Sequence, residues 1–362
     1  MSAAHVTFGL APATRAGGVL ADGGHQLHRD FLDFVVDGRP LLLRLSDLDA
    51  VSPLAADVPP AIFTAQVRGL LLQTGAPLPG GRFVLYGCPE CADLACGAVT
   101  AVIERDGDDY VWRDFAWQTD THADLEFNGY HGVGPFRFHG PEYRAALGAL
   151  LDRDGDGDGP GACPDAVPGR RVLLIGARVA LLARLAAALR STGIGADITG
   201  DIDDVPAEEL RPYGAVAFGP ALGEAERSAA RRVFERAGIA AVFVDGLAPI
   251  VPLLVAQVEQ ALDRGPVAQR RLIALAAGGG EADVEIASPC RVRLTAYRLD
   301  RLSRTQAHEV FDGMLQAGRH RIALDAKAVK GEAFVVARTS GSVLVTAVAR
   351  GKTRLSEGRP GR

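Results

Sequence analysis

The stretch RRVLLIGARVALLARLAAALRSTGIGADIT, residues 170–199, contains an apolar run, a helical pattern and a second apolar run in that order. RRVLLI (170–175) has the length of a buried strand, VALLARLAAALRS (179–191) carries an apolar stripe at helical spacing, and ADIT (196–199) predicts a second strand. Two strands joined through a helix form a right-handed crossover and lie parallel. This stretch therefore predicts a parallel sheet covered by helices.

The same alternation continues beyond this stretch. AVAF (215–218) and AVFV (241–244) predict two more strands, with the helix EAERSAARRVFERAG (224–238) between them and APIVPLLVAQVEQALD (248–263) after them. We therefore expect a small Rossmann-like parallel α/β domain over residues 169–266.

The pattern changes again after residue 266, where short and often alternating apolar runs are separated by glycine or polar turns. This pattern predicts an antiparallel β-sandwich over 267–352, followed by a disordered tail at 353–362. The segment VRLTAYRLDRLSRTQAHEVFDGMLQAGRHRIALDAKAVKGEAFVVART, residues 292–339, resembles the immunoglobulin-like repeats of flagellar hook-cap and secretion-sorting proteins. That resemblance implies a structural or adhesive module without catalytic residues.

A stretch rich in glycine, aspartate and proline precedes the parallel-sheet pattern and predicts a flexible linker over 153–168. Residues 1–152 mix strand and helix patterns and predict an α+β domain that carries a cysteine cluster. CGAVTAVIERDGDDYVWRDFAWQT, for example, predicts two strands that turn at 106–109. The expected fold class is thus multidomain, with a mixed α+β domain, a parallel α/β domain and a β-sandwich.

Composition narrows the functional classes. The net charge of −5 and a pI near 5.9 argue against a nucleic-acid surface, which needs a concentrated basic patch. The N-terminus lacks a basic region followed by an apolar core, and no apolar run is long enough to cross a bilayer. We expect a cytoplasmic protein with no nucleic-acid or membrane partner. In the cytoplasm, clustered cysteines bind metal or react more often than they form disulfides.

The stretch YGCPECADLACG, residues 86–97, holds three of the five cysteines. Cys88-Pro-Glu-Cys91 has the spacing of a zinc knuckle, in which both thiolates reach one ion while backbone N–H groups of the turn point at sulfur. Cys96 follows after four residues and can supply a third thiolate. Zinc is therefore the expected metal, with Cys88, Cys91 and Cys96 as ligands.

A tetrahedral site needs a fourth ligand. His122 is the first candidate, with His131 and His139 as alternatives in the same domain, and Cys163 in the linker is a poorer choice. Two other interpretations stay open: the thiols pack at a strand end, or they run redox chemistry. A thioredoxin-type motif would need a helix after the cysteines, whereas strand-like GAVTAVIE follows Cys96. An iron–sulfur cluster would need a fourth nearby cysteine.

The cysteine stretch together with WRDFAWQT resembles an uncharacterised family of actinobacterial proteins that carry CPEC…CGAVT text, and the resemblance covers residues 25–150. Proteins of that family are sometimes labelled oxidoreductases. The resemblance supports a functional cysteine site.

A nucleotide site is weakly indicated. Gly176 follows the first strand of the parallel pattern, but the second and third glycines of a dinucleotide fingerprint are absent. Asp201 and Asp203 lie beyond the second strand, roughly where a ribose-binding carboxylate would be placed. These three residues are the candidates for cofactor binding, although a solvated acidic loop is the simpler interpretation and NAD(P) is not favoured.

These observations predict a non-enzymatic binding or scaffold protein with a structural zinc site. The alternative is an enzyme, either nucleotide-dependent and oxidoreductase-like or zinc-dependent with an open coordination position. The segment GLAPIVPLLVAQVEQAL, residues 246–262, is apolar nearly all round in its first turns and predicts a second contact besides the sheet. That contact is a protein partner or a homodimer, unless the neighbouring domain covers the segment.

Overall fold

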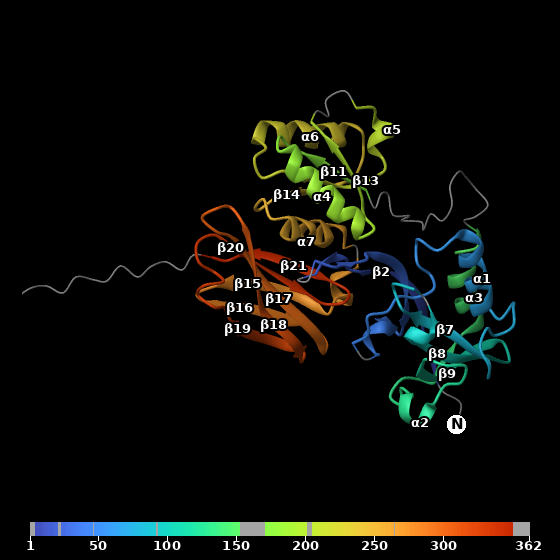
Figure 1. Ribbon diagram of the computed structural model, residues 1–362. Helices are drawn as coiled ribbons and strands as arrows, with labels where there is room; N and C mark the ends of the chain where they lie inside the picture. The colour runs from blue at the N-terminus through green and yellow to red at the C-terminus, as the bar shows by residue number, and fades with distance from the viewer. Residues whose placement is uncertain are drawn as a thin grey trace, which may run out of the picture.

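The computed structural model of the protein describes residues 4–20, 23–45, 47–91, 93–152, 171–200, 205–263 and 265–349. The architecture is mixed α/β with several sheets, one of them parallel (Figure 1). The predicted linker and tail lie outside the described residues. No helix within the described ranges is both long enough and apolar enough to cross a membrane.

The parallel sheet has the strand order β12-β11-β13-β14, and every neighbouring pair is parallel, as predicted. Alternate residues of its strands point to opposite faces. Helices α4 and α7 cover the face that carries Val172 and Leu174, and α6 covers the face that carries Leu173 and Ile175. The elements of this part are β11 (Arg171–Ile175), α4 (Val179–Ser191), β12 (Gly195–Thr199), α5 (Ala207–Leu210), β13 (Tyr213–Phe218), α6 (Glu224–Arg236), β14 (Val242–Asp245) and α7 (Val251–Leu262).

The C-terminal part consists of two antiparallel sheets, ordered β15-β16-β19 and β18-β17-β20-β21, which share one apolar core. Its strands are β15 (Leu272–Gly278), β16 (Glu281–Ile286), β17 (Cys290–Leu299), β18 (Thr305–Leu315), β19 (Gly318–Ala323), β20 (Ala333–Arg338) and β21 (Val343–Ala347), and the short η4 (Val267–Gln269) precedes them. Sequence patterning did not predict β18. This strand lies at a sheet edge and buries only Leu315, so it needs no apolar alternation.

The N-terminal part contains a five-stranded sheet of order β1-β10-β9-β8-β7, a second sheet of order β2-β5-β6 and the small pair β3-β4. An aromatic cluster that includes Phe8, Phe34, Trp112 and Tyr143 fills the space between the two larger sheets. The strands are β1 (His5–Val6), β2 (Phe8–Arg15), β3 (Gly18–Val19), β4 (His25–Gln26), β5 (Arg29–Val36), β6 (Arg39–Pro40), β7 (Arg82–Gly87), β8 (Ala98–Asp106), β9 (Asp109–Gln118) and β10 (Phe136–Phe138). The helices are η1 (Leu41–Leu43), α1 (Pro60–Leu70), η2 (Leu94–Cys96), α2 (Leu125–Asn128) and α3 (Gly140–Gly148).

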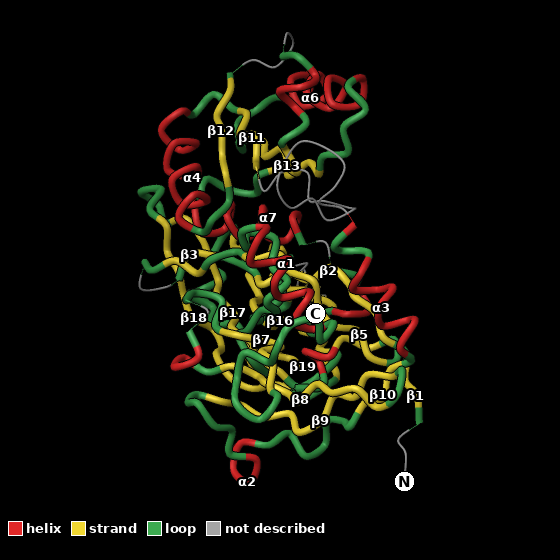
Figure 2. Tube along the Cα trace, turned by 90° about the vertical axis from the view of Figure 1, so that its right-hand side faces the viewer, coloured by secondary structure: helices red, strands yellow, loops and turns green. Residues whose placement is uncertain are grey.

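The β2–β5 ribbon, residues 8–36, connects this part to the other two. One end, at Phe8 and Val36, lies in the aromatic cluster. At the other end β3 contacts α7 (Figure 2), and Gly17 O accepts a 2.5 Å hydrogen bond from Arg338 Nη1 of β20. The ribbon therefore contacts both the parallel-sheet part and the C-terminal part.

Helix α7 lies between the parallel sheet and the C-terminal part. Leu254 and Val258 face the sheet, whereas Ile250 and Leu253 contact Phe334 and its apolar neighbours in the C-terminal part. The apolar excess noted at 246–262 is thus covered within the chain at Leu253 and Leu254, which are both buried. Association through a homodimer or a protein partner stays a prediction.

Candidate metal centre

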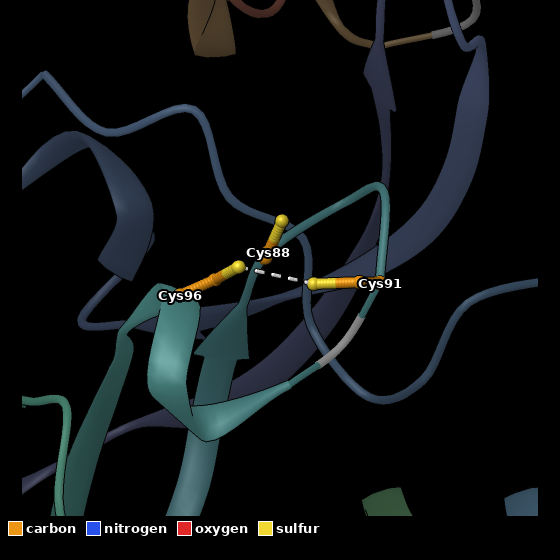
Figure 3. A group of neighbouring side chains, drawn as sticks. All are labelled: Cys88, Cys91 and Cys96. Atoms are coloured by element: carbon orange, nitrogen blue, oxygen red, sulfur yellow. Dashed lines mark hydrogen bonds between the residues drawn. The ribbon is translucent and has the colours of Figure 1, made fainter.

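The three clustered cysteines converge at one end of the five-stranded sheet. β7 and β8 are antiparallel and pair Gly87 with Ala98, so the loop between them must leave and return at the same place. Cys88 begins this loop and Cys96 ends it within η2, while Cys91 lies at the turn between them. The three Sγ atoms all lie within 4.8 Å of one another (Figure 3). This geometry allows one ion to contact all three sulfurs.

Backbone N–H groups of the loop point at two of the sulfurs. The N–H of Asp93 donates to Cys91 Sγ at 3.4 Å, and the N–H groups of Glu90 and Cys91 donate to Cys88. Burial raises the pKa of Cys88, but these donors and the neighbouring thiols outweigh it and hold the pKa below its ordinary value. The hydrogen bonds thus favour the thiolate, which is the form that binds metal.

Cys96 shows the opposite effect. The adjacent Cys91, 3.2 Å away between sulfurs, raises the pKa of Cys96 to about 11 through its hydrogen bond and its charge. Three thiols this close cannot all lose their protons unless a cation compensates the charge. A divalent ion would supply that compensation, and its binding would release the remaining protons.

Arg15 of β2 fixes the position of the loop through two ion pairs. Its guanidinium makes a bidentate ion pair with Asp49, at 2.8 and 2.6 Å, and its Nη1 donates to Glu90 Oε1 at 2.6 Å. Arg15 is only 5% exposed, and burial lowers its pKa, but the two carboxylates outweigh burial and raise the pKa above its ordinary value. The charge of Arg15 is therefore permanent, and it fixes Glu90 in the turn between Cys88 and Cys91.

Two further contacts fix the same turn. Arg29 Nε of β5 donates to Pro89 O at 2.9 Å, so a second guanidinium lies beside the loop. Gly87 and Val51 exchange two backbone hydrogen bonds of 3.1 and 2.9 Å just before Cys88. The turn is thus positioned by the folded N-terminal part rather than by the loop alone.

The far end of the loop depends on Gly97. Its backbone has φ 99° and ψ 144°, a conformation that is essentially restricted to glycine. A Cβ at this position would overlap the indole ring of Trp117 on β9. Gly97 therefore places Cys96 close against the sheet and beside the other two cysteines.

The structure does not bring the expected fourth ligand into this group. His122 lies in an exposed turn after β9, where its Nδ1 is 3.0 Å from Thr121 Oγ1, and it is not among the donors that converge within the described residues. β9 ends with Gln118 paired to Ala98, and the turn that carries His122 leads from there into α2. His131 and His139 are also outside the group, and Cys163 lies outside the described ranges.

Of the three candidate nucleotide residues, the structure describes only Gly176. Gly176 follows β11 and lies directly against Gly219, which follows β13. The crevice at these strand ends is lined mainly by apolar side chains, including Leu182, Phe218 and Leu254, and has a volume of only about 10 Å³. Asp201 and Asp203 lie outside the described residues, so their predicted role stays a prediction.

Sequence reasoning missed Arg15 and Arg29, the two residues that hold the cysteine turn. Their partners Glu90 and Pro89 are 75 and 60 residues away along the chain, so no local pattern links them. The strand that carries Arg15 contains Pro12 and shows no clear alternation. The local signal for them was Glu90, a charged residue between Cys88 and Cys91, which predicts a basic side chain beside the turn.

Comparison with known proteins gives no match: no family model, no curated protein and no solved structure matches the chain. The resemblances noted from the sequence therefore stay expectations, and the geometry of the cysteine site is the observation that bears on function.

Proposed function

We propose that this chain is a zinc-binding scaffold protein whose ion is held by Cys88, Cys91 and Cys96. One observation carries the proposal: three sulfurs within 4.8 Å of one another, with backbone N–H donors already pointing at two of them. Thiolate ligands select zinc, copper(I) or iron–sulfur clusters. A cluster would need a fourth cysteine nearby, and the Cys-x-x-Cys turn with its N–H donors is typical of structural zinc.

The ion would act on the structure of the loop. It would link the turn after β7 to η2, and Arg15 would connect that linked loop to β2. Arg15 and Arg29 would support the site by holding the turn in place, since their charges are already paired with Asp49, Glu90 and Asp57. Supporting contacts of this kind are usually worth 10–100-fold in metal affinity.

The scaffold role is supported by how the rest of the chain is built. The two antiparallel sheets of the C-terminal part offer strand edges and loops to a partner, and we interpret this part as a sandwich-type interaction module. The parallel-sheet part would position that module through α7. A reducing compartment such as the cytoplasm would keep the thiols available for metal.

An enzymatic role is the second candidate, because the described residues supply only three ligands. A zinc ion with three protein ligands and a bound water can activate that water for hydrolysis. The exposed position of Cys91 and Cys96 would leave the fourth position accessible. The number and type of ligands separates this alternative from the structural one.

The test is the zinc content of the full chain purified under reducing conditions. We expect one zinc per chain in the wild type and in Cys290→Ser, which alters a buried thiol of the C-terminal core. We expect loss of zinc in Cys91→Ser. His122→Ala and Cys163→Ser would identify a fourth protein ligand by their weaker retention of zinc. A folded wild type that binds no zinc, or a Cys91→Ser variant that binds it as tightly, would overturn the proposal.

A further inference from the structure

The Sγ atoms of Cys91 and Cys96 lie closer together than two thiolates bound to one zinc ion would. Two thiolates on a tetrahedral zinc ion, each at about 2.3 Å from the metal, are about 3.8 Å apart. In this structure the two Sγ atoms are 3.2 Å apart. A disulfide would bring them to about 2.05 Å, so the pair lies between the two chemical states.

The two thiols also face each other and are reachable from solvent. Figure 3 shows Cys91 and Cys96 pointing toward one another across the loop. Both side chains are exposed, whereas Cys88 is only partly exposed. An oxidant in solution would therefore reach Cys91 and Cys96 more readily than Cys88.

The contacts that position the loop do not depend on the reduced state of this pair. Arg15 holds Glu90 on one side, and Gly97 lies against Trp117 on the other. Asp93 caps η2 by accepting a 2.9 Å hydrogen bond from the N–H of Ala95. A bond between Cys91 and Cys96 would close a short loop inside these anchors without breaking them.

We propose that Cys91 and Cys96 form a disulfide on exposure to a peroxide, which makes the metal centre redox-sensitive. One thiolate attacks a peroxide oxygen, the O–O bond breaks, and a sulfenic acid forms with release of hydroxide. The second thiolate attacks that sulfur and expels a second hydroxide as the S–S bond forms. Two sulfurs lose two electrons, one peroxide is reduced, and two protons from solvent complete two waters. Only Cys88 remains as a ligand, so zinc leaves.

The metal-release half of this inference rests on the proposed zinc site, whereas disulfide formation stands on the thiol geometry alone. Cleavage on the N-terminal side of aspartate separates the two cysteines, because Asp93 lies between them. The resulting peptides, 57–92 and 93–105, stay together only if Cys96 is bonded to Cys91 or Cys88. Serine variants distinguish these two pairings.

The experiment treats the zinc-loaded wild type and the serine variants of the full chain with hydrogen peroxide. Zinc release from the wild type is followed with a chromogenic indicator, and the peptides of every protein are mapped by mass spectrometry. We expect disulfide-linked peptides in the wild type and in Cys88→Ser. In Cys91→Ser the amount of linked peptide should be at least tenfold lower. One zinc should leave per disulfide, and a dithiol reductant should restore binding. Peptides that stay separate after peroxide, or equal linkage in Cys91→Ser, would overturn the inference. Absence of zinc beforehand would count against the proposed function only, and the peptide linkage would still decide this inference.

Discussion

At the scale of single residues, the centre depends on a glycine that no other residue can replace without strain. Gly97 and Gly107 both have positive φ angles, 99° and 66°, but they differ in surroundings. A Cβ at Gly97 would overlap Trp117, whereas a Cβ at Gly107 would meet nothing within 4 Å. Gly97 thus combines a glycine-restricted backbone conformation with a steric conflict, whereas Gly107 has a positive φ angle without any conflict.

We predict that Gly97→Ala lowers the free energy of unfolding by about 3 kcal/mol or more, and that Gly107→Ala lowers it by about 1 kcal/mol. Urea unfolding followed by tryptophan fluorescence measures both. Equal losses in the two variants would contradict the role given to the contact between Gly97 and Trp117.

A second residue of interest is Asp33 on β5, which is buried and accepts a short hydrogen bond from Tyr86 Oη. Burial raises the pKa of Asp33 to about 7, although the hydrogen bonds from Tyr86 and from the N–H groups of Phe34 and Leu42 oppose it. The carboxyl lines a cavity of about 70 Å³ where the three parts of the chain meet. Such a group binds its proton more tightly in the folded chain than in the unfolded one.

The sign of the pH effect follows from that shift. The stabilising contribution of protonated Asp33 is complete below the unfolded pKa, near 4, and is lost as pH rises through about 7. We predict that Asp33→Asn removes this loss, so the variant gains on the order of 2–4 kcal/mol relative to wild type between pH 5 and pH 8. Urea unfolding of both proteins at pH 5 and pH 8 measures this effect. If the difference in unfolding free energy between Asp33→Asn and wild type is the same at both pH values, the prediction is wrong.

At the scale of elements, the β2–β5 ribbon decides whether the cysteine turn is positioned before metal arrives. The turn itself was predictable from Cys-x-x-Cys spacing, because that motif is local. The ribbon was not, because its first strand lacks apolar alternation and its contacts span distant segments. Strongly periodic segments were predicted more accurately, since the helix predicted over 179–191 has those bounds in the structure. Local periodicity thus predicted elements well and their long-range contacts poorly.

The ribbon's contribution to the site can be measured through Glu90. Glu90→Gln replaces the ion pair between Glu90 and Arg15 by a weaker hydrogen bond. The substitution leaves the three cysteines in place and alters only the contact that supports their turn. We predict a zinc affinity about 10-fold lower than wild type. Glu235→Gln, an exposed glutamate on α6, is the matched control and should bind zinc like wild type. Competition with a chelator of known affinity gives both values, and unchanged affinity in Glu90→Gln would show that Arg15 does not support the site.

At the scale of the whole molecule, a buried cluster of charges lies where the ribbon meets the other two parts. His28 Nδ1 is 2.6 Å from Glu259 Oε2 of α7, and His28 Nε2 is 3.2 Å from Asp30 Oδ1. Burial lowers the pKa of His28, but Glu259 and Asp30 outweigh it and raise the pKa to about 10. Arg338 of β20 is partly buried nearby and is attracted to the same glutamate. No local sequence pattern predicts this junction, because its members are distributed over the whole chain.

Because the folded pKa of His28 exceeds the unfolded value, its contribution to stability is complete below about pH 6.5 and is lost as pH rises through about 10. We predict that wild type loses on the order of 2–4 kcal/mol more than His28→Gln between pH 6.5 and pH 10. Chemical unfolding across this range is the measurement. Parallel pH profiles for the two proteins would mean that the junction carries no net charge coupling.

The central claim, that three thiolates of one loop hold a zinc ion, is tested most directly by X-ray absorption at the zinc edge of the purified full chain. We predict three sulfur neighbours at about 2.3 Å and one lighter neighbour near 2.0 Å in the wild type, and loss of this zinc signal in Cys91→Ser. A zinc ion surrounded by oxygen or nitrogen alone, or by sulfurs that persist unchanged in Cys91→Ser, would contradict it.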